Sequence, residues 1–202
     1  MPPTDLKKHF RRLYEPRRGE FAIVEVPPMR FLMVDGEGDP NTVAAFQQGT
    51  QALFGTAFSV KFLLKKIAPS LDFVVPPMEG LWWTDGSCAF DTWDKDAWKW
   101  TIMIAQPDSV TEELFQRAIE QVAAKKRLRH LLPRLELFEE GLSIQTLHVG
   151  AYSEEGPVIE KMHACLREMG YGPRGKHHEI YLGDPRRTEP GRLRTILRQP
   201  IV

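Results

Sequence analysis

The chain has 202 residues, and its 27 Lys and Arg residues balance its 27 Asp and Glu residues, so the formal net charge is zero. A chain without a global field of either sign lacks the usual means of holding nucleic acid or an anionic membrane, and we expect neither as a partner. Its two cysteines, Cys88 and Cys165, are too few for a disulfide framework, and neither a membrane span nor a secretory signal is visible. These observations predict a cytoplasmic protein.

The first half of the chain predicts an arm followed by the order strand–helix–strand–strand. Residues 1–19 are polar and basic and are expected to form a solvated arm or a short surface helix. An extended segment over 21–38 is interrupted at Pro27-Pro28, and a helix follows over 41–67 with a bend or break near Gly55. Further strands are predicted over 71–75, 78–83 and 98–105.

The second half repeats this order after a connecting helix over about 110–129. A strand is predicted over 143–152, a helix over 156–172, and two strands over 177–182 and 192–202. The sequence therefore predicts an α+β fold of tandem strand–helix–strand–strand repeats, about 20–105 and about 140–202, related by pseudo-twofold symmetry around a central ligand cleft. Such a repeat supplies internally what a dimer of single repeats would, so we expect a monomer.

All five tryptophans fall within a 19-residue window. A tryptophan-rich core hairpin explains this clustering, and so does a flat aromatic wall around a ligand, because indole offers a large apolar area and a negative face for cations. Strand alternation cannot decide which of them face a cleft, because Gly80 in mid-strand could mark a bulge that swaps the faces. The residues are Trp82, Trp83, Trp93, Trp98 and Trp100.

The segment HHEIYL (177–182) carries the strongest candidate for chemistry. Alternation places His177, Glu179 and Tyr181 on one side of a strand, and the more apolar 178/180/182 side is expected to pack on helices. A carboxylate among aromatic rings suits recognition of a lipophilic cation or work as a general base. A purely structural pairing of Glu179 with an arginine at 186 or 187 is the alternative. The adjacent histidines face opposite sides and no metal-binding motif occurs, so we expect no metal and no cofactor.

Four segments resemble the GyrI-like small-molecule-binding family. They are FLLKK (62–66), PPMEGLWW (76–83), HVGAYSEEGPVIEKMH (148–163) and GKHHEIYLGDPRRTEPGRLRTILRQPIV (175–202). The resemblance implies a tandem-repeat domain over 20–202 after the 1–19 arm, similar to the effector-binding domains of multidrug-responsive activators. Those activators carry a helix-turn-helix ahead of the domain, and 19 residues are too few for one, so the resemblance implies a stand-alone binder.

The resemblance also implies what the cleft accepts, namely bulky aromatic and often cationic compounds, with Glu179 as the counter-charge. Some stand-alone members are hydrolases that open strained cyclopropane rings by adding water, which is the alternative function. Glu179 would then orient or deprotonate water, and Tyr181 or Tyr152 would donate a hydrogen bond to the leaving oxygen. A third interpretation is a protein-interaction module that inhibits a DNA enzyme such as gyrase. The expected aromatic lining consists of Trp82, Trp83 and Trp100, which would sandwich the ligand, together with Phe46 and Phe62.

Overall fold

Eight strands form one antiparallel sheet in the computed structural model, which describes residues 2–85, 94–126 and 132–202. Cys88 and Trp93 lie outside the described residues. The strand order is β1-β6-β8-β7-β3-β4-β2-β5. The strands are β1 (Ala22–Val26), β2 (Met29–Glu37), β3 (Glu79–Trp83), β4 (Lys99–Gln106), β5 (Arg134–Phe138), β6 (Gly141–Val149), β7 (His177–Tyr181) and β8 (Arg194–Pro200).

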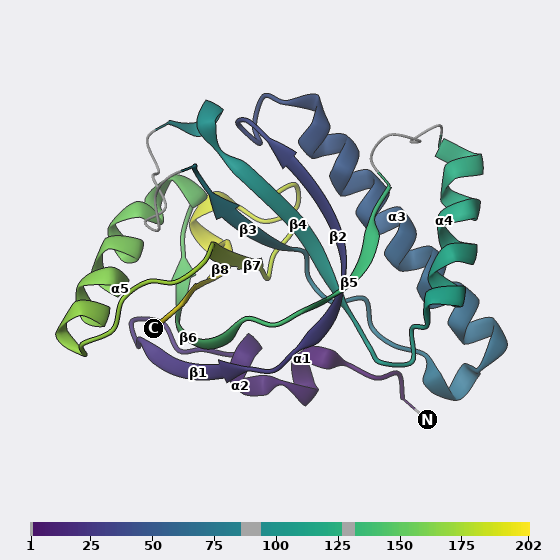
Figure 1. Cartoon of the computed structure of the whole chain (residues 1–202), viewed down its shortest axis with the longest axis horizontal. Helices are drawn as coiled ribbons and strands as arrows, with labels where there is room; N and C mark the ends of the chain where they lie inside the picture. The colour runs from purple at the N-terminus through teal and green to yellow at the C-terminus, as the bar shows by residue number, and fades with distance from the viewer. Residues whose placement is uncertain (1, 86–93, 127–131) are drawn as a thin grey trace.

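Helices cover both faces of this sheet (Figure 1). On one face α3 and α5 pack directly on the strands, and α4 packs alongside α3. On the other face the short helices α1 and α2 are packed against β1, β7 and β8 and against β2 and β4. The fold class is therefore α+β, as the sequence predicts. The helices are α1 (Leu6–His9), α2 (Arg11–Tyr14), α3 (Ala44–Ile67), α4 (Glu112–Lys126) and α5 (Gly156–Glu168), with single 3-10 turns η1 (Pro69–Leu71), η2 (Lys95–Ala97), η3 (Tyr152–Glu154) and η4 (Pro190–Arg192).

The six central strands have the same pairing order in each half, β2-β4-β3 in the first and β6-β8-β7 in the second. In each half, the strand before the long helix pairs with the last strand of that half, and the remaining strands β3 and β7 meet in the middle. The β3–β7 pair is antiparallel, and it joins Gly80 to Glu179 and Leu81 to His178 in register. This is the predicted order of elements in both halves, while an exact twofold relation between them stays a prediction.

Of the local predictions, the interruption at Pro27-Pro28 is confirmed, and others differ from the structure. The two prolines separate β1 from β2, which have different partner strands. The helix α3 runs from Ala44 to Ile67 without interruption, so the predicted break near Gly55 is wrong, while a bend there stays a prediction. Its Gly49 instead permits close packing, because a Cβ there would approach the Val34 Cγ1 atom at 3.2 Å. Residues 71–75 form no strand, and only Phe73 makes a single bridge, to Thr4.

The basic amino-terminal segment is part of the core and not a solvated arm. Leu6, Leu13 and Tyr14 are buried, and they pack on strands of both halves of the sheet. Of the two predicted forms, the short helix is confirmed by α1 and α2, and the solvated arm is wrong because a few apolar side chains of these helices face the sheet. Across the described residues, no helix has the length and apolar character needed to cross a membrane.

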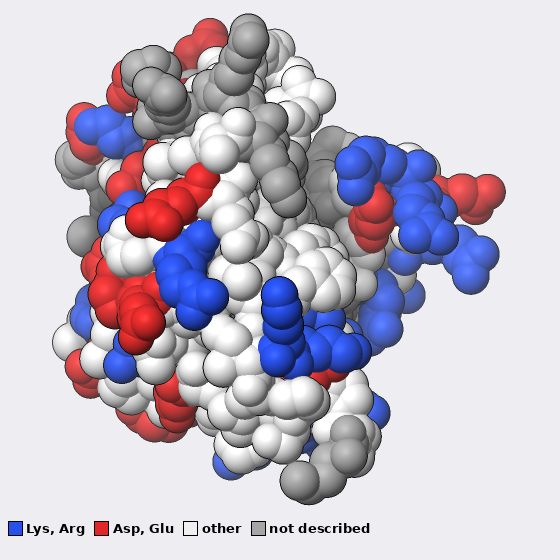
Figure 2. Space-filling model, turned by 90° about the vertical axis from the view of Figure 1, so that its right-hand side faces the viewer, with Lys and Arg blue, Asp and Glu red and all other residues white. Residues whose placement is uncertain are grey.

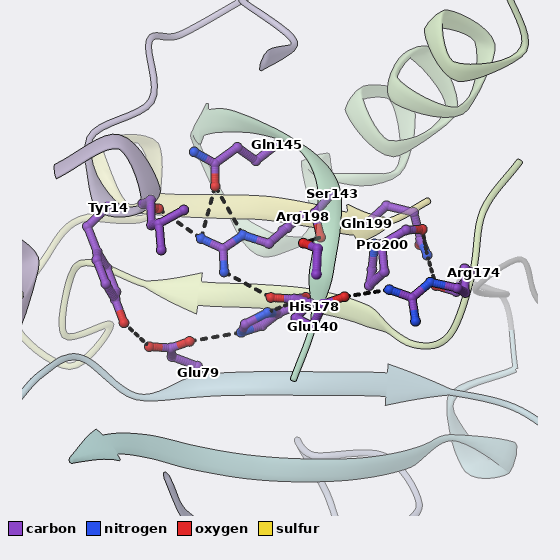
Figure 3. A network of polar contacts seen from close by, with 12 residues as sticks. Tyr14, Glu79, Glu140, Ser143, Gln145, Arg174, His178, Arg198, Gln199 and Pro200 are labelled. Carbon is purple, nitrogen blue, oxygen red and sulfur yellow. Dashed lines mark hydrogen bonds and ion pairs between the residues drawn. The ribbon is translucent and has the colours of Figure 1, made fainter. Parts of the chain in front are cut away.

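We call the β3–β7 strand pair, where the two halves of the sheet meet, the β3–β7 seam. A chain of buried polar groups lies beneath the short helices α1 and α2 and crosses this seam (Figure 3). The Tyr14 hydroxyl donates to Glu79 Oε1 at 2.7 Å, and Glu79 Oε2 lies 3.0 Å from His178 Nε2. The other ring nitrogen of His178 lies 2.8 Å from Glu140 Oε1, and Arg198 Nη1 donates to Glu140 Oε2 at 3.0 Å. All five side chains are buried.

The charges of this network balance when His178 is protonated. Burial lowers the pKa of His178, but the Glu140 and Glu79 carboxylates at its two ring nitrogens outweigh burial and raise the pKa to about 8. Burial has the opposite effect on an acid and raises the pKa of Glu140, but His178 and Arg198 outweigh it and lower this pKa to about 2. Two carboxylates thus face one imidazolium and one guanidinium, an arrangement that buried charges require.

We expect the free energy of unfolding to decrease by about 2 kcal/mol between about pH 6 and pH 9.5 through His178 alone. A folded pKa of about 8 lies above the usual 6.5, so the stabilisation is fully present below pH 6.5 and is lost as pH rises through 8. Urea unfolding at a series of pH values measures this loss. His178→Gln should flatten the slope, whereas His9→Gln, at an exposed position, should retain it. Parallel pH profiles for wild type and His178→Gln would show that His178 is not charged in the fold.

Candidate functional site

The opposite face of the same seam carries a hydrogen-bonded carboxyl and phenol. Because β7 is a regular strand, Glu179 and Tyr181 point toward the α3 and α5 side while His178 points away. The Tyr181 hydroxyl donates to Glu179 Oε2 at 2.7 Å, and the Trp82 indole Nε1 donates to the Tyr181 oxygen at 3.0 Å. Glu179 is only 8% exposed. Burial and the Glu179 carboxylate raise the pKa of Tyr181 well above 10.

Aromatic rings surround this hydrogen-bonded chain. Phe46 on α3 stacks on Trp82, with ring centroids 6.0 Å apart and planes at 28°. Trp98 meets Trp82 edge-on at 5.4 Å, and Tyr152 meets Tyr181 edge-on at 5.6 Å. Tyr152 is 38% exposed and forms the outer edge of the group. We define the Glu179 cluster as Glu179, Tyr181, Trp82, Phe46 and Tyr152.

Gly80 gives the Trp82–Tyr181 contact the space it needs. A Cβ atom on Gly80 would lie 2.7 Å from Trp82 Nε1 and 3.0 Å from the Tyr181 hydroxyl oxygen. The glycine is therefore required by a close side-chain approach across the seam, and β3 remains a regular strand without a bulge.

A second carboxyl on the α5 side is a site feature that the sequence reasoning missed. Glu155 lies between η3 and α5, is 4% exposed, and its Oε1 atom makes no hydrogen bond within the described part of the chain. Burial raises the pKa of Glu155 to about 9, the Glu179 carboxylate adds to this, and the Thr195 hydroxyl opposes it. His177 Nε2 lies 3.6 Å from Glu179 Oε1. The sequence signal for Glu155 is weak, because a glutamate before Gly156-Pro157 at a helix start is typical of a solvated residue.

Three of the predicted lining residues lie elsewhere. Trp100 is fully buried beneath Phe46, with ring centroids 5.1 Å apart, and belongs to the core. Trp83 lies on the opposite face of the sheet from Trp82, under the Lys176 ammonium at 3.4 Å, so these two tryptophans cannot sandwich one ring. Phe62 is 16 residues beyond Phe46, about 24 Å along the helix axis, and 60% exposed.

Arg186 does not form the predicted ion pair with Glu179. Its guanidinium pairs instead with Asp184 at 3.0 Å, at the exposed turn after β7. A surface hollow of about 460 Å³ lies away from Glu179, between α3 and α4, and is lined by Phe58, Phe62 and Gln121 among others. Figure 2 views the molecule from this side, where surface without charged side chains (white) is flanked by lysine and arginine side chains (blue).

Comparison with known proteins points to one family. The model of the GyrI-like small molecule binding domain matches residues 19–201. An uncharacterised conserved protein from Listeria innocua is 41% identical, with a TM-score of 0.90 over 98% of this chain and 100% of that one. A hydrolase from the same organism is 39% identical, with a TM-score of 0.85 and full coverage of both chains. The C-terminal domain of EcmrR shares the fold at 10% identity, with a TM-score of 0.54 over 91% of this chain and 97% of that one. No curated protein matches.

We expect Gly80→Ala to separate Trp82 from Tyr181 and to destabilise the fold by about 1–3 kcal/mol, since a Cβ would overlap the indole nitrogen. The indole N–H signal of Trp82 in proton–nitrogen NMR, assigned with Trp82→Phe, should shift, and urea unfolding gives the stability change. Gly156→Ala is the matched control, because its Cβ would meet nothing within 4 Å at the first turn of α5. An unchanged Trp82 signal in Gly80→Ala would contradict the assigned geometry.

Proposed function

Since the chain belongs to the GyrI-like small-molecule-binding family, we propose that it binds bulky, flat aromatic compounds, often cationic, at the Glu179 cluster. The observation that supports this proposal is a nearly buried carboxyl held at the edge of several aromatic rings. Aromatic faces attract both planar rings and cations, and a carboxylate with little water around it attracts a cation more strongly than one in bulk solvent.

The hydrogen bonds of the cluster set the direction of the carboxyl. The Trp82 N–H donates to Tyr181, and Tyr181 in turn donates to Oε2 of Glu179. Oε1 of Glu179 then remains for a ligand, with His177 as its neighbour at 3.6 Å. Because Trp82 and Glu179 are almost fully covered, the ligand enters by displacing the most exposed ring of the cluster, Tyr152.

Hydrolysis at the same cluster is the second candidate function, and the full-length relative that is a hydrolase favours it. Glu179 would accept a proton from water as the water oxygen attacks a strained ring carbon. The carbon–carbon bond of the ring would break, and its electrons would move to a conjugated carbonyl oxygen, which takes up a proton. The net reaction adds one water.

Binding is tested with ethidium, a flat cation, and with its neutral parent 6-phenylphenanthridine, by fluorescence titration. We expect Glu179→Gln to weaken ethidium binding by about 10–30-fold and the neutral compound much less, because only the cation loses a counter-charge. Trp82→Leu should weaken both compounds. Trp83→Leu is the matched control, since Trp83 lies on the other face of the sheet. Equal ethidium affinity for Trp82→Leu and Trp83→Leu would contradict a site at the Glu179 cluster.

Hydrolysis is tested with a spirocyclopropyl cyclohexadienone, which water converts to hydroxyethylphenol. Mass spectrometry detects the added water, and the loss of dienone absorbance gives the rate. We expect turnover by the wild type and a decrease of about 100- to 10,000-fold in Glu179→Gln, the range for loss of a general base. Consumption of the dienone no faster than in buffer would reject hydrolysis of this class and leave the binding proposal standing.

A further inference from the structure

Glu155 is the buried titratable group beside the Glu179 cluster to which the proposed function gives no role. Its backbone is fixed at the start of α5, where its N–H donates to the Tyr152 carbonyl at 3.2 Å and its own carbonyl accepts from Ile159 at 3.0 Å. Its side chain extends inward, with only 4% of the residue exposed, and Oε1 has no hydrogen-bond partner among the described residues. A buried carboxyl oxygen without a partner is costly and is uncommon away from functional sites.

Glu155 is in direct contact with the Glu179 cluster through Tyr152. The Glu155 N–H donates to the carbonyl of Tyr152 at 3.2 Å, and the Tyr152 ring lies 5.6 Å from the ring of Tyr181. In keeping with this placement, the Glu155 carboxyl contributes to the raised pKa values of both tyrosines. Two nearly buried carboxyls therefore share one site with two phenols.

The opening of a strained ring needs a proton donor as well as a base, and the phenols are poorly suited to this task. The Tyr181 hydrogen is already donated to Glu179, and the pKa of this phenol is raised well above 10. Burial, with the nearby Glu155 and Glu179 carboxyls, raises the pKa of Tyr152 to about 12. Glu155 holds its proton at neutral pH and is nevertheless a stronger acid than either phenol, since its pKa is raised only to about 9.

We propose that Glu155 is the proton donor of the site and forms an acid–base pair with Glu179. This inference rests on the proposed hydrolysis. Glu179 accepts a proton from water while the water oxygen bonds to the ring carbon. The broken carbon–carbon bond delivers its electrons to the carbonyl oxygen, which takes the proton of Glu155. A proton passing from Glu179 to Glu155 then restores both groups, so the cycle consumes one water and no other reactant.

The pH dependence of this pair is set by the groups around it. Burial is the main cause of the high pKa of Glu155, and the ionised Glu179 is the second. Ionisation of Glu155 above about pH 9 removes the donor, so turnover should decrease there. The other titratable groups that face the pair are His177 and Tyr181 on β7 and Tyr152 on η3. Beyond them, Asp184 acts on Tyr152, His163 on α5 neighbours His177, and His148 on β6 contacts the Ala151 carbonyl ahead of η3.

The decisive variant is Glu155→Gln, assayed with the spirocyclopropyl cyclohexadienone across pH. We expect turnover to decrease by about 100-fold or more and the loss of rate above pH 9 to disappear, because the donor is already absent. Ethidium binding at neutral pH should stay within about twofold of wild type, since a protonated carboxyl and an amide carry the same charge. Thermal melting at pH 8 shows whether the variant folds, and it should melt no lower than wild type. Glu160→Gln, on the exposed side of α5, is the matched control and should behave as wild type.

Infrared difference spectroscopy gives a readout that does not depend on turnover. At neutral pH the wild type should show a protonated carboxyl band that disappears above pH 9 and is absent from Glu155→Gln. If Glu155→Gln retains both the rate and its alkaline decrease, or if the band persists in that variant, the role of Glu155 is overturned while hydrolysis stands. If the wild type itself does not turn over the dienone, the proposed hydrolysis fails and this role fails with it.

Discussion

The structure depends on a single antiparallel strand pair, β3 with β7, where its two halves meet. Buried charges must be paired, and the contact between Glu79 on β3 and His178 on β7 is made only when this register is kept. A slip of one residue between these two strands would place Glu79 and His178 on opposite faces and leave Glu79 without its imidazole partner. The same register directs Glu179 and Tyr181 to the other side. The register that pairs the buried charges on one face therefore also positions the proposed site residues on the other.

Buried carboxyls on the two faces of the seam differ in their charged partners and in the direction of their pKa shifts. Beneath α1 and α2, Glu140 has an imidazolium and a guanidinium within 3.0 Å, and its pKa is lowered. On the α5 side, neither Glu155 nor Glu179 has a lysine or arginine partner in the described ranges, and the pKa of Glu155 is raised. Complete pairing gives a rigid support. Incomplete pairing is what the proposed acid–base roles of Glu155 and Glu179 require, because a carboxyl bound to a lysine or arginine would stay ionised.

Sequence alone predicted the order of elements and the shared face of Glu179 and Tyr181, because both follow from periodicity. It could not choose between Trp82 and Trp83, since the effect of Gly80 on β3 depends on a side chain from another strand. The burial of Leu13 and Tyr14 was missed because a few apolar residues in a basic segment give no periodic signal. Glu155 was missed for a related reason, since its burial depends on how α5 packs on β8 and not on its neighbours in sequence.

The network beneath the short helices also links the two ends of the chain. Arg198 Nη2 donates to the Leu13 carbonyl at 2.9 Å, across 185 positions of sequence. During synthesis Arg198 follows Leu13 by 185 positions, so this contact forms only after residues from both halves of the sheet have been made. Contacts this distant in sequence slow folding and join both halves into one cooperative unit. The packing of α2 on the sheet therefore waits for β8.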